Sequence, residues 1–161
     1  MDCRGQDEAE EAILCRKYLS SMAAKDIFVL TYDRMRRYGG TWHVEKKLLL
    51  PCCIFLESEN VTLLLKELRE REMEYKKGVG LLRIKKDEEK FLKVLYGGGR
   101  HLKMSKGVIK NGVPEVTAGP LKGMEQRICK IERHKRLAKL ALSTEQGIGY
   151  ITAGLEITEK I

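Results

Sequence analysis

Positively charged side chains crowd one stretch of this 161-residue chain, between Leu121 and Lys139. The stretch carries seven Lys or Arg residues against two Glu residues, a local net charge of +5. Such side chains bind phosphates, and the flat guanidinium group of Arg also stacks on unpaired bases. The candidate RNA-binding residues are Lys122, Arg127, Lys130, Arg133, His134, Lys135, Arg136 and Lys139. A solvated hairpin without a ligand stays open as the alternative.

The densest part of this cluster, Arg133 to Arg136, falls where two strands are expected to turn. Its side chains should therefore fan out from a loop at one end of a small sheet. A second basic segment, 33–47, contains Arg34, Arg36, Arg37, Lys46 and Lys47. This segment could face DNA, but a charged strand edge that discourages aggregation is the simpler interpretation for most of its members.

The sequence offers little for catalysis or metal binding. His43, His101 and His134 belong to no nucleophile motif, and Ser105 lacks the Gly-x-Ser-x-Gly elbow. The five cysteines, at positions 3, 15, 52, 53 and 129, show no Cys-x-x-Cys spacing and no nearby histidine pair. We therefore predict a non-enzymatic protein with reduced thiols, no metal site and no cofactor.

The overall composition is that of a folded, basic protein. Hydrophobic residues make up 43% of the chain, and the net charge of +8 favours a polyanionic partner, although it could simply maintain solubility. The longest apolar run, 48–56, is broken by Pro51 and is shorter than the roughly 20 residues of a membrane span. Because the N-terminus shows no signal-peptide pattern, we expect a cytoplasmic protein without membrane contact.

The residue pattern predicts an α/β sandwich in the first half of the chain, with helices covering a mostly antiparallel sheet. The first predicted helix is 7–22, with Ala12, Cys15, Leu19 and Met22 inward. The second is capped by Asn60, with Val61, Leu64, Leu65 and Leu68 inward. The third is opened by Asp87, has Phe91, Val94 and Leu95 inward, and ends at the glycines 97–99. Its predicted strands are 27–32, 48–57 and 79–84, together with a hairpin arm over 33–47 that turns at Gly39 and Gly40.

After the three glycines, helical periodicity ends and turn signals separate short alternating segments. This pattern predicts a small β-barrel. The predicted fold is thus α+β, with one domain over 1–98, a linker over 99–105 and a second domain over 106–161. Because proline donates no backbone hydrogen bond, the strand around Pro114 is expected to begin later in the sequence or to lie at an edge of the sheet.

The segment 116–125, Val-Thr-Ala-Gly-Pro-Leu-Lys-Gly-Met-Glu, resembles the KOW motif. Its continuation over 128–138 is similar to that of NusG paralogues of the LoaP type, and the first half of the chain resembles the NusG N-terminal (NGN) domain. In the matching stretch 49–56, Cys52 and Cys53 stand where the family has Gly and Tyr. The strand that opens the family's N-terminal domain is also shortened to Met1, Asp2 and Cys3.

This resemblance implies an NGN-like sandwich followed by an SH3-like KOW barrel, in a monomer without cofactor. It implies a processive antiterminator that binds the clamp helices of RNA polymerase with the first domain and a nascent RNA hairpin with the second, non-template DNA being a further candidate partner. The implied polymerase-binding residues are Leu49, Leu50, Pro51, Cys53 and Tyr32. A general NusG factor, whose KOW domain binds a termination factor or ribosomal protein, and a ribosome-associated KOW protein stay open as alternatives.

Overall fold

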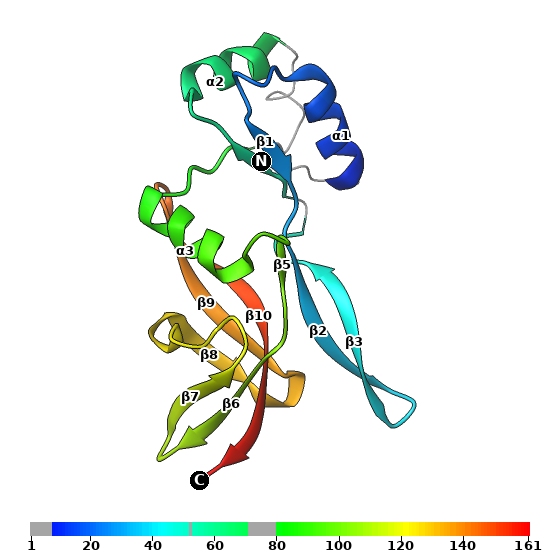
Figure 1. Ribbon diagram of the computed structural model, residues 1–161, viewed down its shortest axis with the longest axis vertical. Helices are drawn as coiled ribbons and strands as arrows, with labels where there is room; N and C mark the ends of the chain where they lie inside the picture. The colour runs from blue at the N-terminus through cyan, green and yellow to red at the C-terminus, as the bar shows by residue number, and fades with distance from the viewer. Residues whose placement is uncertain (1–7, 52, 71–79) are drawn as a thin grey trace. The chain divides into compact units, whose positions relative to one another are not determined.

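The computed structural model describes residues 8–51, 53–70 and 80–161 of this mixed α+β protein. These residues form three helices and ten strands in three sheets (Figure 1). The chain divides into two compact units, residues 1–30 with 50–82 and residues 31–49 with 83–161. Each compact unit is built from two separate segments of the chain, whereas each predicted domain, 1–98 and 106–161, is one continuous segment. The predicted domains concern which parts fold independently, and that division stays a prediction.

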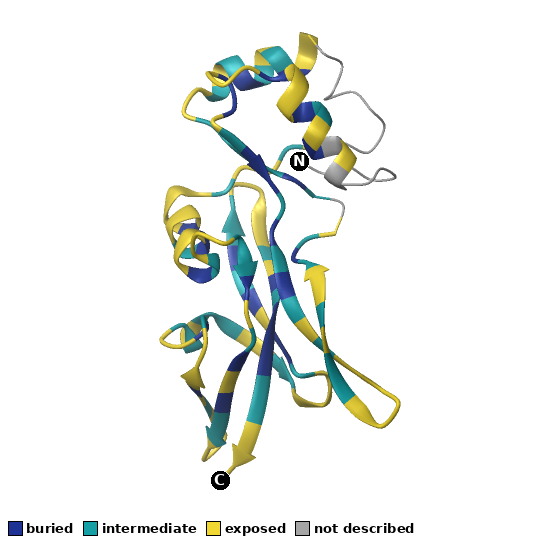
Figure 2. Ribbon diagram, turned by 45° about the vertical axis from the view of Figure 1, so that its right-hand side comes forward, coloured by how far each residue is buried: buried dark blue, intermediate teal, exposed yellow. Residues whose placement is uncertain are grey.

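The first unit packs two helices around a short strand pair. It contains α1 (Glu8–Tyr18), β1 (Asp26–Phe28), β4 (Phe55–Glu57) and α2 (Val61–Glu70). Strands β1 and β4 run antiparallel, with Ile27 opposite Leu56. Cys15, Ile54 and Leu68 are almost completely buried in its core. Figure 2 colours the buried parts of the helices and strands dark blue.

Helix α1 ends at Tyr18, four residues earlier than predicted. Beyond it, the backbone amide and hydroxyl of Ser20 donate hydrogen bonds to the Glu67 carboxylate at 2.8 and 2.6 Å, and the Ser20 carbonyl accepts from the amide of Ala24. This turn leads the chain away from the helix axis. Met22, predicted to point inward, is therefore 76% exposed.

Helix α2 begins where the sequence predicts. The side-chain oxygen of Asn60 accepts a hydrogen bond from the amide of Leu63 at 3.0 Å, which confirms the predicted cap. Leu64 and Leu68 are buried as expected, whereas Val61 and Leu65 are only half-buried.

The predicted strand 48–57 is correct only at its two ends. Pro51 has no amide hydrogen, and the amide of Cys53 donates to the carbonyl of Leu50 in a tight turn. The predicted strand 27–32 is likewise two strands, since β1 ends at Phe28 and β2 begins at Thr31.

The second unit begins with the predicted hairpin arm. Strands β2 (Thr31–Tyr38) and β3 (Thr41–Leu48) pair along their whole length, and Gly39 and Gly40 have φ values of +58° and +81°. Two positive φ values suit the tight turns that match the twist of a hairpin. The short strand β5 (His101–Leu102) pairs with β2 in parallel and completes a three-stranded sheet.

Helix α3 (Lys86–Tyr96) ends at Gly97, as predicted. Its buried residues are Glu88, Leu92 and Leu95, whereas Val94, predicted to point inward, is 70% exposed. The described part of the predicted strand 79–84, residues 80–84, forms only a single bridge between Ile84 and Thr144. Val79 and residues 1–7, with the shortened strand predicted there, lie outside the described residues, as does Cys52.

The last part of the chain is a five-stranded sheet with the order β7-β6-β10-β9-β8. The strands are β6 (Ser105–Lys110), β7 (Val113–Ala118), β8 (Ile128–Glu132), β9 (Leu137–Thr144) and β10 (Gly147–Lys160). Strand β10 pairs in parallel with β6 and antiparallel with β9, and Leu140, Ile151 and Leu155 are buried. Pro114 lies in the edge strand β7, as expected. Among the described residues, strand pairing does not join β7 to β8.

The Gly-Pro-Leu-Lys-Gly loop between β7 and β8 is held tightly against the sheet. Leu121 is fully buried, and its amide donates to the hydroxyl of Ser105 at 3.1 Å. Gly119 has a φ of +96°, and a Cβ there would come within 2.6 Å of the Ser105 Cα. Only glycine fits this combination of close approach and positive φ.

The Glu125 carboxylate closes the same loop. The pKa of this carboxyl is lowered, mainly by a hydrogen bond from the backbone amide of Glu125 itself. Backbone hydrogen bonds from Val116 and Gly123 and the nearby charge of Lys122 lower the pKa further, whereas burial raises it by a smaller amount. The bond from Val116 measures 3.1 Å. Loop geometry and Glu125 ionisation are therefore coupled.

None of the helices in the described parts of the chain is long and apolar enough to cross a membrane.

Candidate nucleic-acid interface

The basic segment 133–136 forms the predicted turn between β8 and β9. Arg133–Lys135 make one turn of 3₁₀ helix, and Arg136 follows with a φ of +53°. The amide of Arg136 donates to the carbonyl of Arg133 at 3.1 Å, which closes the turn. Arg133, His134 and Lys135 are exposed, so their side chains are available to a ligand.

Arg136 joins this turn to the hairpin arm. Its guanidinium carbon lies 4.1 Å from the centre of a ring of Trp42, which β3 contributes. The same guanidinium group forms an ion pair with Glu156 on β10 at 2.8 Å. A cation held over an indole is attracted by the ring's electrons, and a fixed carboxylate keeps the cation in place. Arg136 is thus positioned from both sides.

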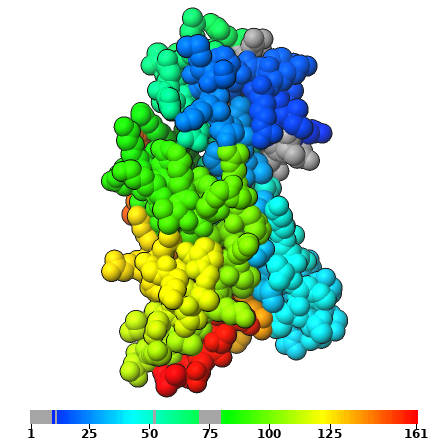
Figure 3. Space-filling model, viewed as in Figure 1, coloured from blue at the N-terminus to red at the C-terminus, as the bar shows by residue number. Residues whose placement is uncertain are grey.

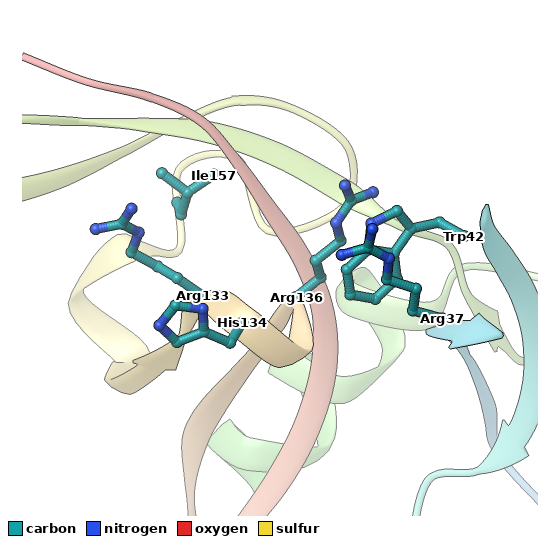
Figure 4. Close-up of a pocket in the computed structure, with 6 residues that line it drawn as sticks. All are labelled: Arg37, Trp42, Arg133, His134, Arg136 and Ile157. Carbon is teal, nitrogen blue, oxygen red and sulfur yellow. The ribbon is translucent and has the colours of Figure 1, made fainter. Parts of the chain in front are cut away.

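A cavity of about 460 Å³ opens between the turn and the arm (Figure 4). The guanidinium groups of Arg37 and Arg136 lie next to the indole of Trp42, with Arg133, His134 and Ile157 grouped across from them. No carboxylate is among these six lining residues. The cavity therefore suits a ligand that is both anionic and flat.

A second cavity of about 370 Å³ continues along the arm. Glu45 is the one carboxylate among the residues that line the two cavities. The cationic side chains that line them are Arg34, Arg36, Arg37, Lys47, Arg133, Lys135 and Arg136, seven in all. Glu45 lies 3.5 Å from Lys47 and 3.8 Å from Arg36. We call this combined surface the loop–arm cleft. Its excess positive charge attracts phosphates.

Glu132 moderates the charge at the edge of the cleft. Its carboxylate lies 2.8 Å from the Lys135 ammonium and 3.7 Å from that of Lys130. The pKa of the Glu132 carboxyl is lowered, mainly by the hydrogen bond from Lys135. The charges of Lys135, Lys130 and Lys139 lower the pKa further, whereas burial raises it by a smaller amount. Glu132 therefore competes with any phosphate for these lysines.

The base of the arm is fixed to the strands that follow α3. His101 bridges the hydroxyl of Thr31 at 2.8 Å and the carboxylate of Asp33 at 2.7 Å, and the amide of Met104 donates to Asp33 at 3.1 Å. Gly154 on β10 lets the arm approach, since a Cβ there would lie 2.5 Å from the Asp33 carbonyl oxygen. In Figure 3 the arm, in cyan, borders the orange and red C-terminal segments.

The structure brings only part of the predicted RNA-binding set together. Arg133, His134, Lys135 and Arg136 share the cleft, whereas Arg127 forms two contacts with the buried Glu88 at 2.7 and 2.8 Å and lies over the ring of Phe91. These contacts give Arg127 a structural task.

The other three predicted residues line neither cavity. Lys130 and Lys139 are cross-strand partners on β8 and β9, and Lys122 is exposed in the Gly-Pro loop. They can extend a phosphate-binding surface but do not shape the cleft.

The predicted polymerase-binding residues differ in their exposure. Tyr32 and Leu49 are buried in the second unit, at 6% and 5% exposure. Leu50 and Cys53 in the first unit are half-buried, and Pro51 is exposed. Only the last three present side-chain surface to a partner.

No protein-family model matches the chain, and no curated protein matches it either.

The contribution of the arm to the cleft was missed in the sequence, because the order of residues does not reveal that β3 lies beside the 133–136 turn. The signal was the single Trp in the basic hairpin, which follows Arg36 and Arg37 and precedes Lys46 and Lys47, since an aromatic among cations is typical of nucleic-acid surfaces. Among the described residues, no group of three or more His, Cys, Asp or Glu side chains is arranged to hold a metal ion.

Proposed function

We propose that this protein is a transcription elongation factor of the NusG type, which acts as a processive antiterminator by holding RNA polymerase and nascent RNA at the same time. The observation that carries the proposal is the loop–arm cleft, where six cationic side chains accompany a stacked Trp42–Arg136 pair. Charge of this density favours a polyanion, and the aromatic ring favours one with accessible bases.

The order of elements supports the family assignment. A helix, a strand, a basic hairpin, a further strand, two helices and the short strand β5 precede the five strands β6 to β10. This order suits an NGN-like sandwich followed by a KOW barrel of the SH3 type. The motif 116–125 runs from β7 through the Gly-Pro loop to the turn before β8, where Gly119 and Leu121 have clear structural tasks.

We infer that the polymerase contact lies at the turn of Leu50, Pro51 and Cys53. All three side chains are apolar; Pro51 is exposed and the other two are half-buried. Burial of apolar area stabilises such a contact by about 25 cal/mol per Å², so a small patch needs support from neighbouring residues. The clamp helices of RNA polymerase are the partner that the family resemblance suggests.

The proposed mechanism is tethering, without a chemical step. One surface stays on the elongating enzyme while the cleft holds a hairpin of the transcript, so the factor remains bound as elongation continues. Bridging the polymerase clamp across the nucleic-acid channel disfavours the opened state in which pausing and termination occur. Target choice then depends on the RNA.

The test is single-round transcription with purified polymerase on a template whose leader encodes the hairpin that co-purifies with the protein. The protein should increase readthrough of a downstream terminator, and deletion of the hairpin sequence should abolish that increase. Readthrough that is independent of the hairpin would favour a general NusG-type factor. No effect on elongation with either template would contradict the proposal.

The polymerase contact is tested separately by Leu50→Asp, with Met22→Asp as the control because Met22 is an exposed apolar residue of the same unit. Leu50→Asp should abolish co-purification with polymerase and leave RNA affinity unchanged. Retained association would contradict the assignment of this turn as the docking surface.

A further inference from the structure

Trp42 is the only tryptophan of the chain and stands at the meeting point of the arm and the 133–136 turn. It lies on β3 directly opposite Arg37 on β2, and it remains half-buried. Since Arg136 already lies over the indole, the ring is held in place before any ligand arrives. Pre-positioned rings lose little freedom on binding.

The cavity beside this ring has the size and chemistry of a nucleotide site. Its volume of about 460 Å³ falls within the range of ~300–1,000 Å³ that is typical of small-molecule sites. Arg37 and Arg133 supply guanidinium groups for phosphate, and Trp42 supplies a surface on which a base can stack.

We propose that Trp42 of the arm and the 133–136 turn form one composite site, which holds a single unpaired nucleotide of a nucleic-acid strand. The base stacks on the indole of Trp42, and its phosphates bind Arg133 and Arg37. Arg136 acts as a positioning residue, fixed by Glu156 and holding the indole. This inference rests on the proposed function and extends it, because it makes the arm part of the site that selects the ligand.

The composite site separates unpaired from paired strands. Charge alone attracts duplex and single strand alike, but a base can reach the indole only after it leaves the helical stack. The competing interpretation is that the Trp42–Arg136 contact only pins the arm to the sheet. That interpretation predicts no response of the indole to nucleic acid.

The lone tryptophan makes the experiment direct, because emission excited at the red edge of the protein absorption band, where the six tyrosines do not absorb, reports on Trp42 alone. Titration with poly(A) should quench this emission, whereas the poly(A)·poly(U) duplex at equal phosphate concentration should leave it unchanged. Unchanged emission with poly(A), or equal quenching by the duplex, would overturn the composite site. Poly(dA) distinguishes the source: tighter binding of poly(A) assigns the site to RNA, and tighter binding of poly(dA) assigns it to an exposed DNA strand.

Substitutions provide a second readout, measured by the anisotropy of fluorescein-labelled oligo(A). Trp42→Ala should weaken binding about tenfold, in line with the loss of one base–aromatic stack, while Trp42→Phe should stay within about threefold of the wild type. Urea denaturation of each variant separates loss of stacking from loss of fold. Wild-type affinity in Trp42→Ala would overturn the composite site and leave the proposed function standing. That function fails separately, if the protein has no effect on transcript elongation.

Discussion

At the scale of single residues, carboxylates set how much of the positive charge is available. Glu132 occupies Lys135 and Lys130, and its lowered pKa keeps it ionised at neutral pH. Glu132→Gln should therefore strengthen binding of single-stranded RNA and steepen the dependence of log affinity on log salt by about 0.7, the slope of one further phosphate contact. Anisotropy over a salt series measures both quantities. An unchanged slope would mean that these lysines do not reach the RNA.

Glu125 predicts how the fold responds to acid. Its backbone hydrogen bonds lower the pKa in the folded state, so its contribution to stability is fully present above the ordinary value of 4.5 and is lost as the pH falls through the lowered value. Urea midpoints should be higher for the wild type than for Glu125→Gln at pH 6, and this difference should shrink below about pH 4.5. A difference that grows on acidification would contradict the sign of the shift.

Arg127 separates the structural cations from the ligand-binding ones. Arg127→Gln leaves the buried carboxylate of Glu88 without its charged partner and should lower the free energy of unfolding by about 2 kcal/mol, less than for a fully buried pair because Arg127 is one-third exposed. Adding Glu88→Gln should recover part of this loss. If Arg127→Gln instead lowers RNA affinity and leaves stability unchanged, Arg127 belongs to the RNA site as the sequence predicted.

At the scale of elements, the two glycines of the Gly-Pro loop offer a matched comparison. Both have positive φ, but a Cβ at Gly123 would meet nothing within 4 Å, whereas one at Gly119 would meet the backbone of Ser105. Gly123→Ala should cost about 1 kcal/mol of stability for the left-handed backbone, and Gly119→Ala about 3 kcal/mol or more because the loop must also move. Equal costs, measured by urea denaturation, would show that the close approach is relieved without strain.

The sequence predicted the boundaries that local residues set, but not those that distant contacts set. The arm turn at Gly39 and Gly40, the Asn60 cap and the end of α3 at Gly97 were all predicted, because glycine and capping residues act within a few positions. The end of α1 at Tyr18 depends on Glu67, nearly fifty residues away. Glu88 was not placed inward because its partner Arg127 comes from the turn before β8, far along the chain. Contacts of this kind leave no periodic pattern.

The same limit applies to the candidate site. The basic turn Arg133–Arg136 was predicted from composition and alternation, but the joining of this turn to Trp42 depends on how the arm packs beside β10. Gly154 and the Thr31–His101–Asp33 network fix that packing, and each is unremarkable in the sequence. The sequence thus indicated the charge, and the fold supplied the aromatic surface.

At the scale of the whole molecule, the account requires the cleft, rather than net charge, to bind RNA. The direct test compares two variants that each lose two cations. Arg133→Ala with Lys135→Ala removes charge from the cleft, and Lys86→Ala with Lys90→Ala removes equal charge from exposed positions on α3 that line neither cavity. Affinity of the full chain for its co-purifying RNA hairpin is measured over a salt series. The account predicts at least tenfold weaker binding and a shallower salt slope for the cleft variant alone. Equal losses in the two variants would contradict it.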